Sequence, residues 1–284
     1  MYGQNYSTSI PDEDYPSGDG WPVGFIPVAV HTVDDDTDYV NFGYIKIDES
    51  ACAPVLSIGN PDADCDRQTK LWDMAKSSPE LQAFQNRPDV RRLYLKQFIC
   101  VVALLGNLTK NCGEKIDIDN LWVVRDSLLI EQIHANDSLR ASNSWFTDDL
   151  FDQITTINDQ VQVYQNGIFN GTLMMNSLDV GLELQKIRGG SLFNDINMHM
   201  NIKLDCRNKT TAGCKWINAL KYYAYSAHDT TIYALFSIMH IQNAVIRPSG
   251  YPDYSAATFI ELWLNHSDNK PYFKVSVGLD LLKT

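Results

Sequence analysis

The pattern of hydrophobic and polar positions divides the chain into a long helical section and several strand-like runs outside it. From about Asp66 to Asn201 the pattern is predominantly that of amphipathic helices. Short apolar runs rich in β-branched and aromatic residues each predict a strand: residues 24–33, 222–226, 259–264 and 272–277. The polar stretch Asn265–Lys270 between the last two runs predicts that they form a hairpin.

Three helices are predicted inside the helical section. The first begins at Pro88, and its apolar residues recur at spacings of three to five positions as far as Leu105. The other two cover residues 116–134 and 147–164. Thr147 is placed to cap the last of these, and the aspartates that follow it complement the positive end of the helix dipole.

The order of these elements predicts an α/β domain that is interrupted by a helical subdomain. Gly189-Gly190 is predicted to break the helical pattern, so that Ser191 caps a separate helix toward Asn201. We therefore expect residues 1–60 and 190–284 to form the α/β domain, and residues 61–189 to form a helical cap.

Candidate chemistry lies in the hexapeptide Ser226–Thr231, which contains His228 and Asp229 between a strand-like run and a helix-like run, 232–241. A helix N-terminus offers unpaired N–H groups and a positive dipole end to an anion. The histidine can donate to a phosphate oxygen, and the carboxyl can protonate a leaving oxygen. A chain with six histidines often contains a His-Asp pair by chance, so the pair alone does not establish a site.

In this setting the hexapeptide resembles the C-terminal signature of the histidine acid phosphatases, the lysosomal and prostatic acid phosphatase type. Further segments between about Trp21 and Leu279 are similar to that family: Ile26–Val33, Gly189-Gly190 with Leu192, Ile196 and His199, and Glu261-Leu262. The resemblance implies a mixed sheet flanked by helices, with an inserted helical cap over the site. It also implies a phosphate monoester substrate, and it allows for a homodimer because family members often dimerise.

The resemblance assigns roles to two residues. His228 matches the histidine that contacts the phosphate, and Asp229 matches the aspartate that donates a proton to the leaving alcohol. The family's nucleophilic histidine, which becomes phosphohistidine, and its phosphate-binding arginines come from an Arg-His-Gly-x-Arg-x-Pro motif and an Arg-Ser-x-Asp-x-x-Arg motif. Neither motif occurs in this sequence, and Met1–Tyr6 aligns just after the second. We therefore expect an N-terminally truncated family member without the covalent route.

No other residue is predicted to replace the missing groups. None of the six histidines follows an arginine or precedes a glycine: His31, His134, His199, His228, His240 and His266. His31 is expected to be structural. Arg125 and Arg188 are placed in cap segments that can face a cleft, although the simpler interpretation is that both are exposed helix arginines. The sequence has no P-loop, G-x-S-x-G, H-E-x-x-H or C-x-x-C motif, so no cofactor and no metal are predicted.

Composition excludes several classes of partner. The net charge of −12 argues against nucleic acid or an anionic membrane surface as a partner. The longest apolar run, Phe98–Leu105, has eight residues, whereas a membrane span needs about 20. With 284 residues, 44% of them hydrophobic, the chain can build a sizeable core.

Two features indicate the secretory pathway. The chain has six N-glycosylation sequons, at Asn5, Asn107, Asn136, Asn170, Asn208 and Asn265. It also has an even number of cysteines, which permits disulfides of unpredicted connectivity: Cys52, Cys65, Cys100, Cys112, Cys206 and Cys214. The polar N-terminus has no signal peptide, so the expected location, secreted or lysosomal, is that of the parent protein.

The sequence supports two hypotheses of different classes. In the first, the chain is an acid phosphatase family protein whose parent enzyme hydrolyses phosphate monoesters at acidic pH through phosphohistidine. This chain keeps only His228 and Asp229 and is expected to be inactive alone. In the second, it is a non-catalytic binding or interaction protein of the secretory pathway on the same fold. An unrelated glycosylated binding module is disfavoured, because the resemblance covers most of the chain.

Overall fold

The computed structural model describes residues 10–13, 18–19, 65–90, 118–136, 138–143, 146–246, 251–254 and 256–278. Helices predominate in these residues, and the two sheets they contain are small. The predicted strand at residues 24–33, which includes His31, lies outside the described residues. The predicted helix from Pro88 is described only as far as residue 90, where it is helical.

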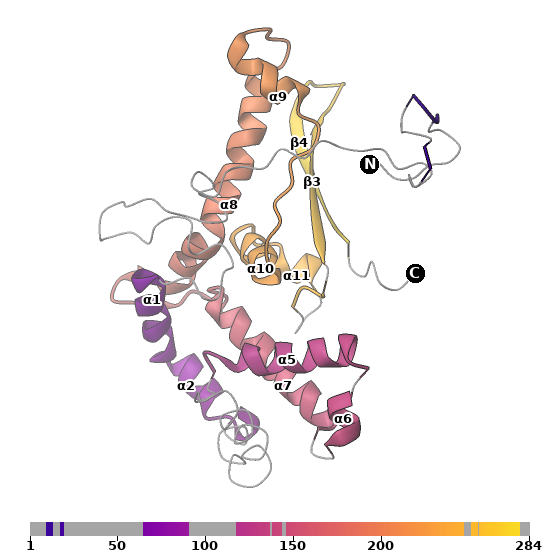
Figure 1. Cartoon of the computed structure of the whole chain (residues 1–284). Helices are drawn as coiled ribbons and strands as arrows, with labels where there is room; N and C mark the ends of the chain where they lie inside the picture. Colours follow the sequence, from indigo (N-terminus) through magenta and orange to yellow (C-terminus); the bar gives the residue numbers. More distant parts are fainter. Residues whose placement is uncertain are drawn as a thin grey trace.

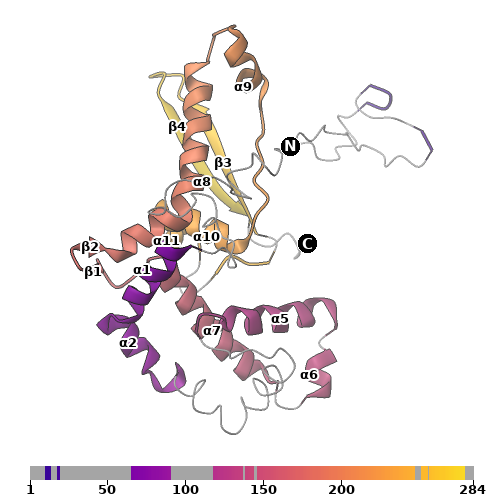
Figure 2. The ribbon, with the colours of Figure 1, turned by 60° about the vertical axis from the view of Figure 1, so that its left-hand side comes forward.

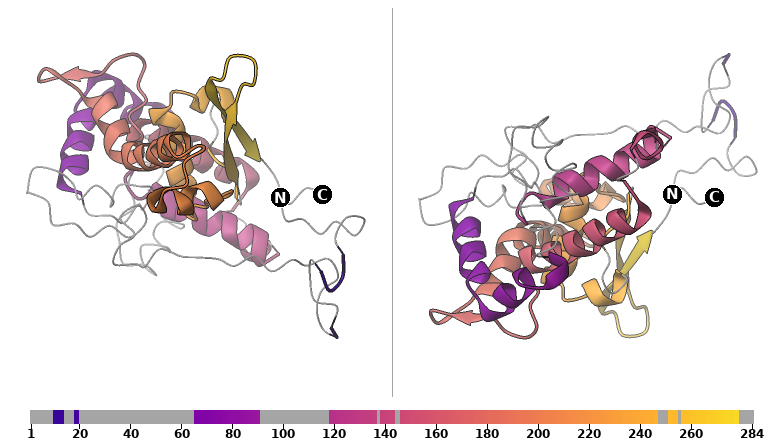
Figure 3. Two further views of the ribbon diagram at one scale, coloured as in Figure 1. Left: turned by 90° about the horizontal axis from the view of Figure 1, so that it is seen from above. Right: turned by 90° about the horizontal axis from the view of Figure 1, so that it is seen from below.

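The first part of the described chain forms a layer of helices around one large core. Its helices are α1 (Asp66–Lys76), α2 (Pro79–Gln85), α5 (Leu121–His134), α6 (Ser138–Ser142) and α7 (Asp148–Gln165). Seen from above and below, α1 and α2 lie on one side of the molecule and the C-terminal hairpin lies on the opposite side (Figure 3). The apolar faces of the helices share a core that includes Leu71, Ala75, Leu81, Phe84, Leu128, Ile154 and Val161.

Local sequence explains where these helices begin. The hydroxyl of Thr147 accepts a hydrogen bond from the backbone N–H of Leu150, at 3.2 Å between oxygen and nitrogen, and Ser78 does the same for Leu81 at 3.3 Å. The predicted cap at Thr147 is therefore confirmed, together with the helix that follows it. The helix predicted at residues 116–134 is also confirmed, although it begins at Leu121.

The longest helix, α8 (Val180–Asp205), connects the helical layer to the C-terminal part (Figure 1). The prediction that Gly189-Gly190 breaks the helix is wrong. At Gly189, α8 crosses α10 (Asp229–Ile238) so closely that a Cβ atom would lie 2.2 Å from the carbonyl oxygen of Ala234. A glycine costs about 1 kcal/mol of helix propensity relative to alanine. Here the cost is outweighed, because only glycine permits this approach of the two helices.

The C-terminal part combines α10 with an antiparallel hairpin. Strands β3 (Ala257–Leu264) and β4 (Pro271–Gly278) pair in register from Ala257 opposite Gly278 to Leu264 opposite Pro271. This confirms the predicted hairpin and its polar connection. One face of the hairpin packs on α10 through Ile260, Val275 and Val277. The remaining short elements are β1 (Met174–Met175), β2 (Leu178–Asp179), η2 (Ala212–Cys214), α9 (Lys215–Ala219) and α11 (Gln242–Val245).

Residues 220–228 connect α9 to α10 and have no regular secondary structure. The segment runs beside α8 and the hairpin in both side views (Figures 1 and 2). The prediction of a strand at residues 222–226 is therefore wrong for the described structure. The run pairs with neither of the described two-stranded sheets, which are β1 with β2 and β3 with β4.

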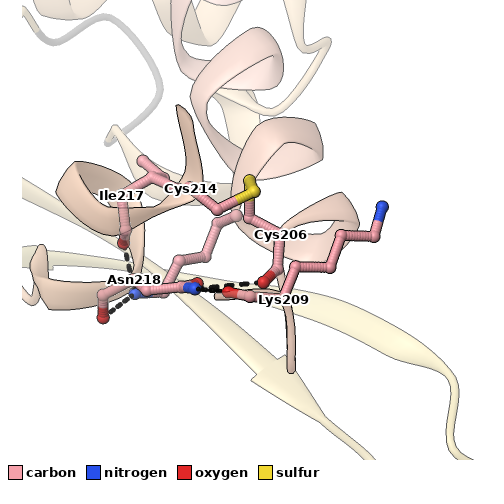
Figure 4. The surroundings of a disulfide bond; sticks show 6 residues. Cys206, Lys209, Cys214, Ile217 and Asn218 are labelled. Atoms are coloured by element: carbon pink, nitrogen blue, oxygen red, sulfur yellow. Dashed lines mark hydrogen bonds between the residues drawn. A yellow bond between two sulfur atoms is a disulfide. The ribbon is translucent and has the colours of Figure 1, made fainter. Parts of the chain in front are cut away.

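A disulfide between Cys206 and Cys214 closes the loop that follows α8 (Figure 4). The side-chain amide of Asn218 donates from Nδ2 to the carbonyl oxygens of Cys206, at 3.1 Å, and Lys209, at 2.9 Å. These contacts hold the loop against α9, and α9 in turn leads into the segment that carries His228.

Together these elements form the predicted α/β fold with a helical cap, in which the cap helices and α10 enclose the candidate site. The division of the chain at residues 60 and 189 stays a prediction. Because α8 continues through Gly190, the two predicted parts share one helix rather than meeting at a linker.

Candidate functional site

His228 and Asp229 stand at the N-terminus of α10, where the sequence predicts the site. His228 is the N-cap residue and Asp229 begins the helix. The backbone N–H of His228 donates to the hydroxyl of Thr231 (N to Oγ1, 3.3 Å), and the backbone N–H of Thr230 donates to Oδ1 of Asp229 (2.7 Å). The two threonines of the motif thus stabilise the turn that presents both side chains to solvent.

The pair opens into a cavity of about 370 Å³. Side chains from α1, α5, α7 and α8 form most of its wall, together with Tyr251. His228 and Asp229 therefore lie in a cleft against the helical cap, as predicted. The segment that leads to them, residues 220–228, is irregular and is not the predicted strand.

Two arginines of the cap line this cavity. Arg188 comes from α8 and is only 7% exposed. Arg125 comes from α5 and has 19% of its side chain exposed. The interpretation of both as exposed helix arginines is therefore wrong, because the helix faces that carry them turn toward the cavity instead of toward bulk solvent.

Three carboxyl groups also line the cavity, and two of them lie beside cations of the wall. Lys76 Nζ donates to Oδ2 of Asp119 at 2.8 Å. Burial opposes the charge of Lys76, but the hydrogen bond to Asp119 and the charges of Asp119 and Asp73 outweigh burial and raise the Lys76 pKa. The Arg125 guanidinium lies farther from its neighbour, with 3.8 Å between Nη1 and Oδ1 of Asp126. The third carboxyl group is that of Asp229.

The pKa of Asp229 is raised above its ordinary value, mainly because surrounding protein desolvates the carboxylate. The negative charge of Asp126 adds to this effect, whereas the backbone N–H of Thr230 and the positive charge of Arg125 oppose it. The residue remains open to solvent on the cavity side. A carboxyl group with a raised pKa keeps its proton to higher pH, which is what a general acid requires.

Several buried polar atoms of the wall have no hydrogen-bond partner in the described part of the chain. The clearest are the amide oxygens of Asn158 and Gln162, two residues that are 4% and 5% exposed. The hydroxyl of Tyr251 and the Nε of Arg125 are also buried without a hydrogen-bond partner in the described residues. A buried polar group without a partner is costly. These atoms lie beneath the cavity surface, so the wall has a polar layer behind its exposed side chains.

Most of the cavity wall that the cap supplies is not predicted by the sequence. On α7 the buried face carries Asn158, Asp159 and Gln162 beside Ile154 and Val161. Polar side chains within an otherwise apolar helical face were an available signal, because buried polar residues need a structural or functional partner. Tyr251 gave no such signal, since it lies outside every predicted element.

In the described residues, no three His, Cys, Asp or Glu side chains come together in a group that can hold a metal ion. His199 instead lies with Asp195 and Tyr225, with 3.1 Å between its Nδ1 and Oδ2 of Asp195.

The described helices include none with the length and apolarity to cross a membrane.

The sequence matches a family model and several curated relatives. Residues 1–278 match the model of the histidine phosphatase superfamily (branch 2). A Caenorhabditis elegans protein named "Putative acid phosphatase 10" is 27% identical over 269 residues, which cover 94% of this chain and 57% of the relative. The lysosomal acid phosphatase of Xenopus laevis is 23% identical over 256 residues, which cover 89% of this chain and 46% of the relative.

No solved structure matches the chain. The chain spans about half the length of the curated relatives that it matches. The family model nevertheless covers nearly all of its residues, and His228 and Asp229 lie together in a cavity under the helical cap. The chain therefore belongs to the histidine phosphatase superfamily (branch 2), as a member of its histidine acid phosphatases.

Proposed function

We propose that the cavity at the N-terminus of α10 binds a phosphate monoester, with His228 as the phosphate contact and Asp229 as the proton donor to the leaving alcohol. The observation that carries the proposal is that both residues lie at a helix N-terminus and line the same polar cavity. The helix end favours an anion. The raised pKa of Asp229 suits a group that must be protonated before the ester bond breaks.

The complete acid phosphatase reaction needs a nucleophile that this sequence does not supply. In that reaction a histidine nitrogen attacks phosphorus, the ester P–O bond breaks, and the aspartate protonates the departing oxygen; water then hydrolyses the phosphohistidine. None of the six histidines stands in an Arg-His-Gly motif. We therefore infer that the chain alone binds phosphate monoesters but turns them over negligibly, whereas its parent protein is an acid phosphatase.

The test measures binding and turnover on the same preparation. Inorganic phosphate is titrated into the purified chain by calorimetry at pH 5, and p-nitrophenyl phosphate is used to measure hydrolysis. We expect binding without hydrolysis, weaker binding by His228→Ala, and unchanged binding by His266→Ala, a matched change at an exposed histidine far along the hairpin. Hydrolysis near that of a complete relative, abolished by His228→Ala, contradicts the inferred inactivity. A chain that binds no phosphate contradicts the site itself.

The alternative function is a non-catalytic binding or interaction protein of the secretory pathway. The absence of both nucleophile and arginine motifs from the sequence favours it. It differs from the first proposal in one measurable way. Supplying a relative's N-terminal segment with the Arg-His-Gly motif restores hydrolysis if the site is that of an acid phosphatase, and leaves the chain inactive if the cavity has diverged to another use.

A secreted or lysosomal location of the parent protein has three sources of support. The four sequon asparagines in the described residues are all exposed, as glycosylation requires: Asn136, Asn170, Asn208 and Asn265. The Cys206–Cys214 disulfide fits an oxidising compartment. One relative is named a lysosomal acid phosphatase. A homodimer stays a prediction of the family resemblance.

A further inference from the structure

We propose that Arg188 is the anion-binding residue of this cavity, and that its buried guanidinium pairs with the phosphate group of a phosphate monoester. This inference rests on the proposed function of the same cavity and names the residue that supplies its positive charge. The two family motifs that carry phosphate-binding arginines do not occur in the sequence. A charge-assisted grip on phosphate must therefore come from another element of the chain.

The position of Arg188 is set by neutral partners from two other elements. Its Nε donates to Oδ1 of Asn166, just after α7, at 2.9 Å. Its Nη1 faces Oε1 of Gln68 on α1 at 3.4 Å. Asn166 is itself held, because its Nδ2 donates to the carbonyl oxygen of Gln162 at 2.8 Å. The guanidinium is thus oriented by three helices without being neutralised by any of these contacts.

Among the cations that line the cavity in the described residues, Arg188 differs in having no carboxylate within 4.0 Å. Lys76 is paired with Asp119, and Arg125 lies beside Asp126. Arg188 is also the most buried of the three. Burial lowers the pKa of its guanidinium, but an arginine remains protonated in proteins. A buried, oriented and uncompensated positive charge is the arrangement that an anion completes.

Tyr251 lines the cavity together with Arg188, His228 and Asp229. Its hydroxyl has no hydrogen-bond partner in the described part of the chain. Burial raises the pKa of Tyr251; the negative charge of Asp229 raises it further, and the positive charge of Arg188 lowers it. Arg188, Tyr251 and Asp229 all line this one cavity.

Asn158 and Gln162 contribute polar side chains to the wall of the same cavity. Both residues are more than nine-tenths buried, and both amide oxygens lack a partner in the described structure. At acidic pH a phosphate monoester is a monoanion that keeps one P–O–H group, because its second pKa is about 6. Such an ion can accept charge-assisted hydrogen bonds from the Arg188 guanidinium.

The experiment separates the charge of Arg188 from its role in packing. Inorganic phosphate and phenyl phosphate are titrated into the chain by calorimetry at pH 5, with a thermal melt of each variant. Arg188→Gln is expected to weaken binding by about tenfold or more, because it removes a charge-assisted contact. Arg207→Gln is the matched control: this exposed arginine lies just after α8, its side chain bonds only Asn269 among the described contacts, and binding is expected to be unchanged.

A second variant keeps the arginine and the fold. Gln68→Glu places a carboxylate at the position 3.4 Å from Nη1, at the half-buried edge of the cavity. If Arg188 receives the anion, this variant binds phosphate several-fold more weakly and melts at an equal or higher temperature, because the new ion pair neutralises the guanidinium.

The outcomes distinguish the two proposals. If the unmodified chain binds phosphate and both variants bind it as tightly, the role of Arg188 is overturned while the proposed function stands. If the unmodified chain binds no phosphate, both are overturned. Weaker binding by Arg188→Gln alone, with a lowered melting temperature and with Gln68→Glu unaffected, identifies a structural role and also overturns the inference.

Discussion

The crossing of α8 and α10 leads to a prediction in which two adjacent glycines respond oppositely to the same substitution. A Cβ atom on Gly189 would lie 2.2 Å from the carbonyl oxygen and 2.8 Å from the carbonyl carbon of Ala234, and 2.9 Å from Cγ2 of Ile238. Real Cβ contacts essentially never fall below 3.0 Å, so the backbones of the two helices must separate by at least 0.8 Å at that point. A backbone carbonyl cannot rotate away as a side chain can.

The expected magnitude follows from two opposing effects. Overpacking of this kind costs about 1–3 kcal/mol, and here the upper end applies because the contacts are with backbone. The gain in helix propensity from glycine to alanine is about 1 kcal/mol. We therefore expect Gly189→Ala to lower the free energy of unfolding by about 2 kcal/mol. It also displaces α10, which begins with His228 and Asp229, so phosphate affinity should fall with stability.

Gly190 provides the matched control. A Cβ atom at Gly190 meets nothing within 4 Å, so only the propensity term remains. Gly190→Ala should raise the free energy of unfolding by about 0.5–1 kcal/mol. Urea denaturation followed by circular dichroism measures both variants. Equal stabilisation by the two substitutions would refute the close crossing and, with it, the explanation of the unbroken helix.

Three further predictions concern stability. Burial raises the pKa of Asp159 to about 6; the charge of Arg125 opposes this effect and the charge of Asp253 adds to it. A carboxyl group with a raised pKa contributes stability below pH about 4, and this stability is lost as pH rises through about 6. The loss in the free energy of unfolding is up to about 3 kcal/mol. Asp159→Asn should therefore match the unmodified chain at pH 4 and exceed its stability at pH 7, and an unchanged pH dependence of urea unfolding would exclude this mechanism. The Nζ of Lys203 donates to three backbone carbonyl groups at the end of α9, and the shortest contact is 2.6 Å. Lys203→Met should lower the free energy of unfolding by about 1–2 kcal/mol and speed amide hydrogen exchange in residues 215–220. Unchanged exchange in these residues would count against the contact. Replacing Cys206 and Cys214 by serine should lower stability by about 2–3 kcal/mol, and a melting temperature unaffected by the double change would show that the described hydrogen bonds hold the loop without the disulfide.

The parts of the fold that sequence predicted well depend on residues close together in the chain. Thr147 caps α7 because its hydroxyl reaches an N–H three residues later, and the β3–β4 hairpin follows from two alternating runs around a short polar connection. The placement of His228 and Asp229 at a helix N-terminus has the same origin, since Thr231 stabilises that turn locally. Such interactions are within a few positions of each other, so a single sequence contains the information needed to find them.

The tertiary structure decided what each surface of these elements meets. Considered by itself, Gly189 indicates a helix break. In the structure it is the point where α8 touches α10 at Ala234, a residue 45 positions later in the chain. The run at residues 222–226 has strand-forming composition, but a strand requires a ladder partner, and the run pairs with none of the described strands. Arg188 appears in the sequence as one more helix arginine. Only the packing of α1, α7 and α8 buries it between amide oxygens and places it in the wall of the cavity, because burial and charge compensation depend on contacts between residues far apart in the chain.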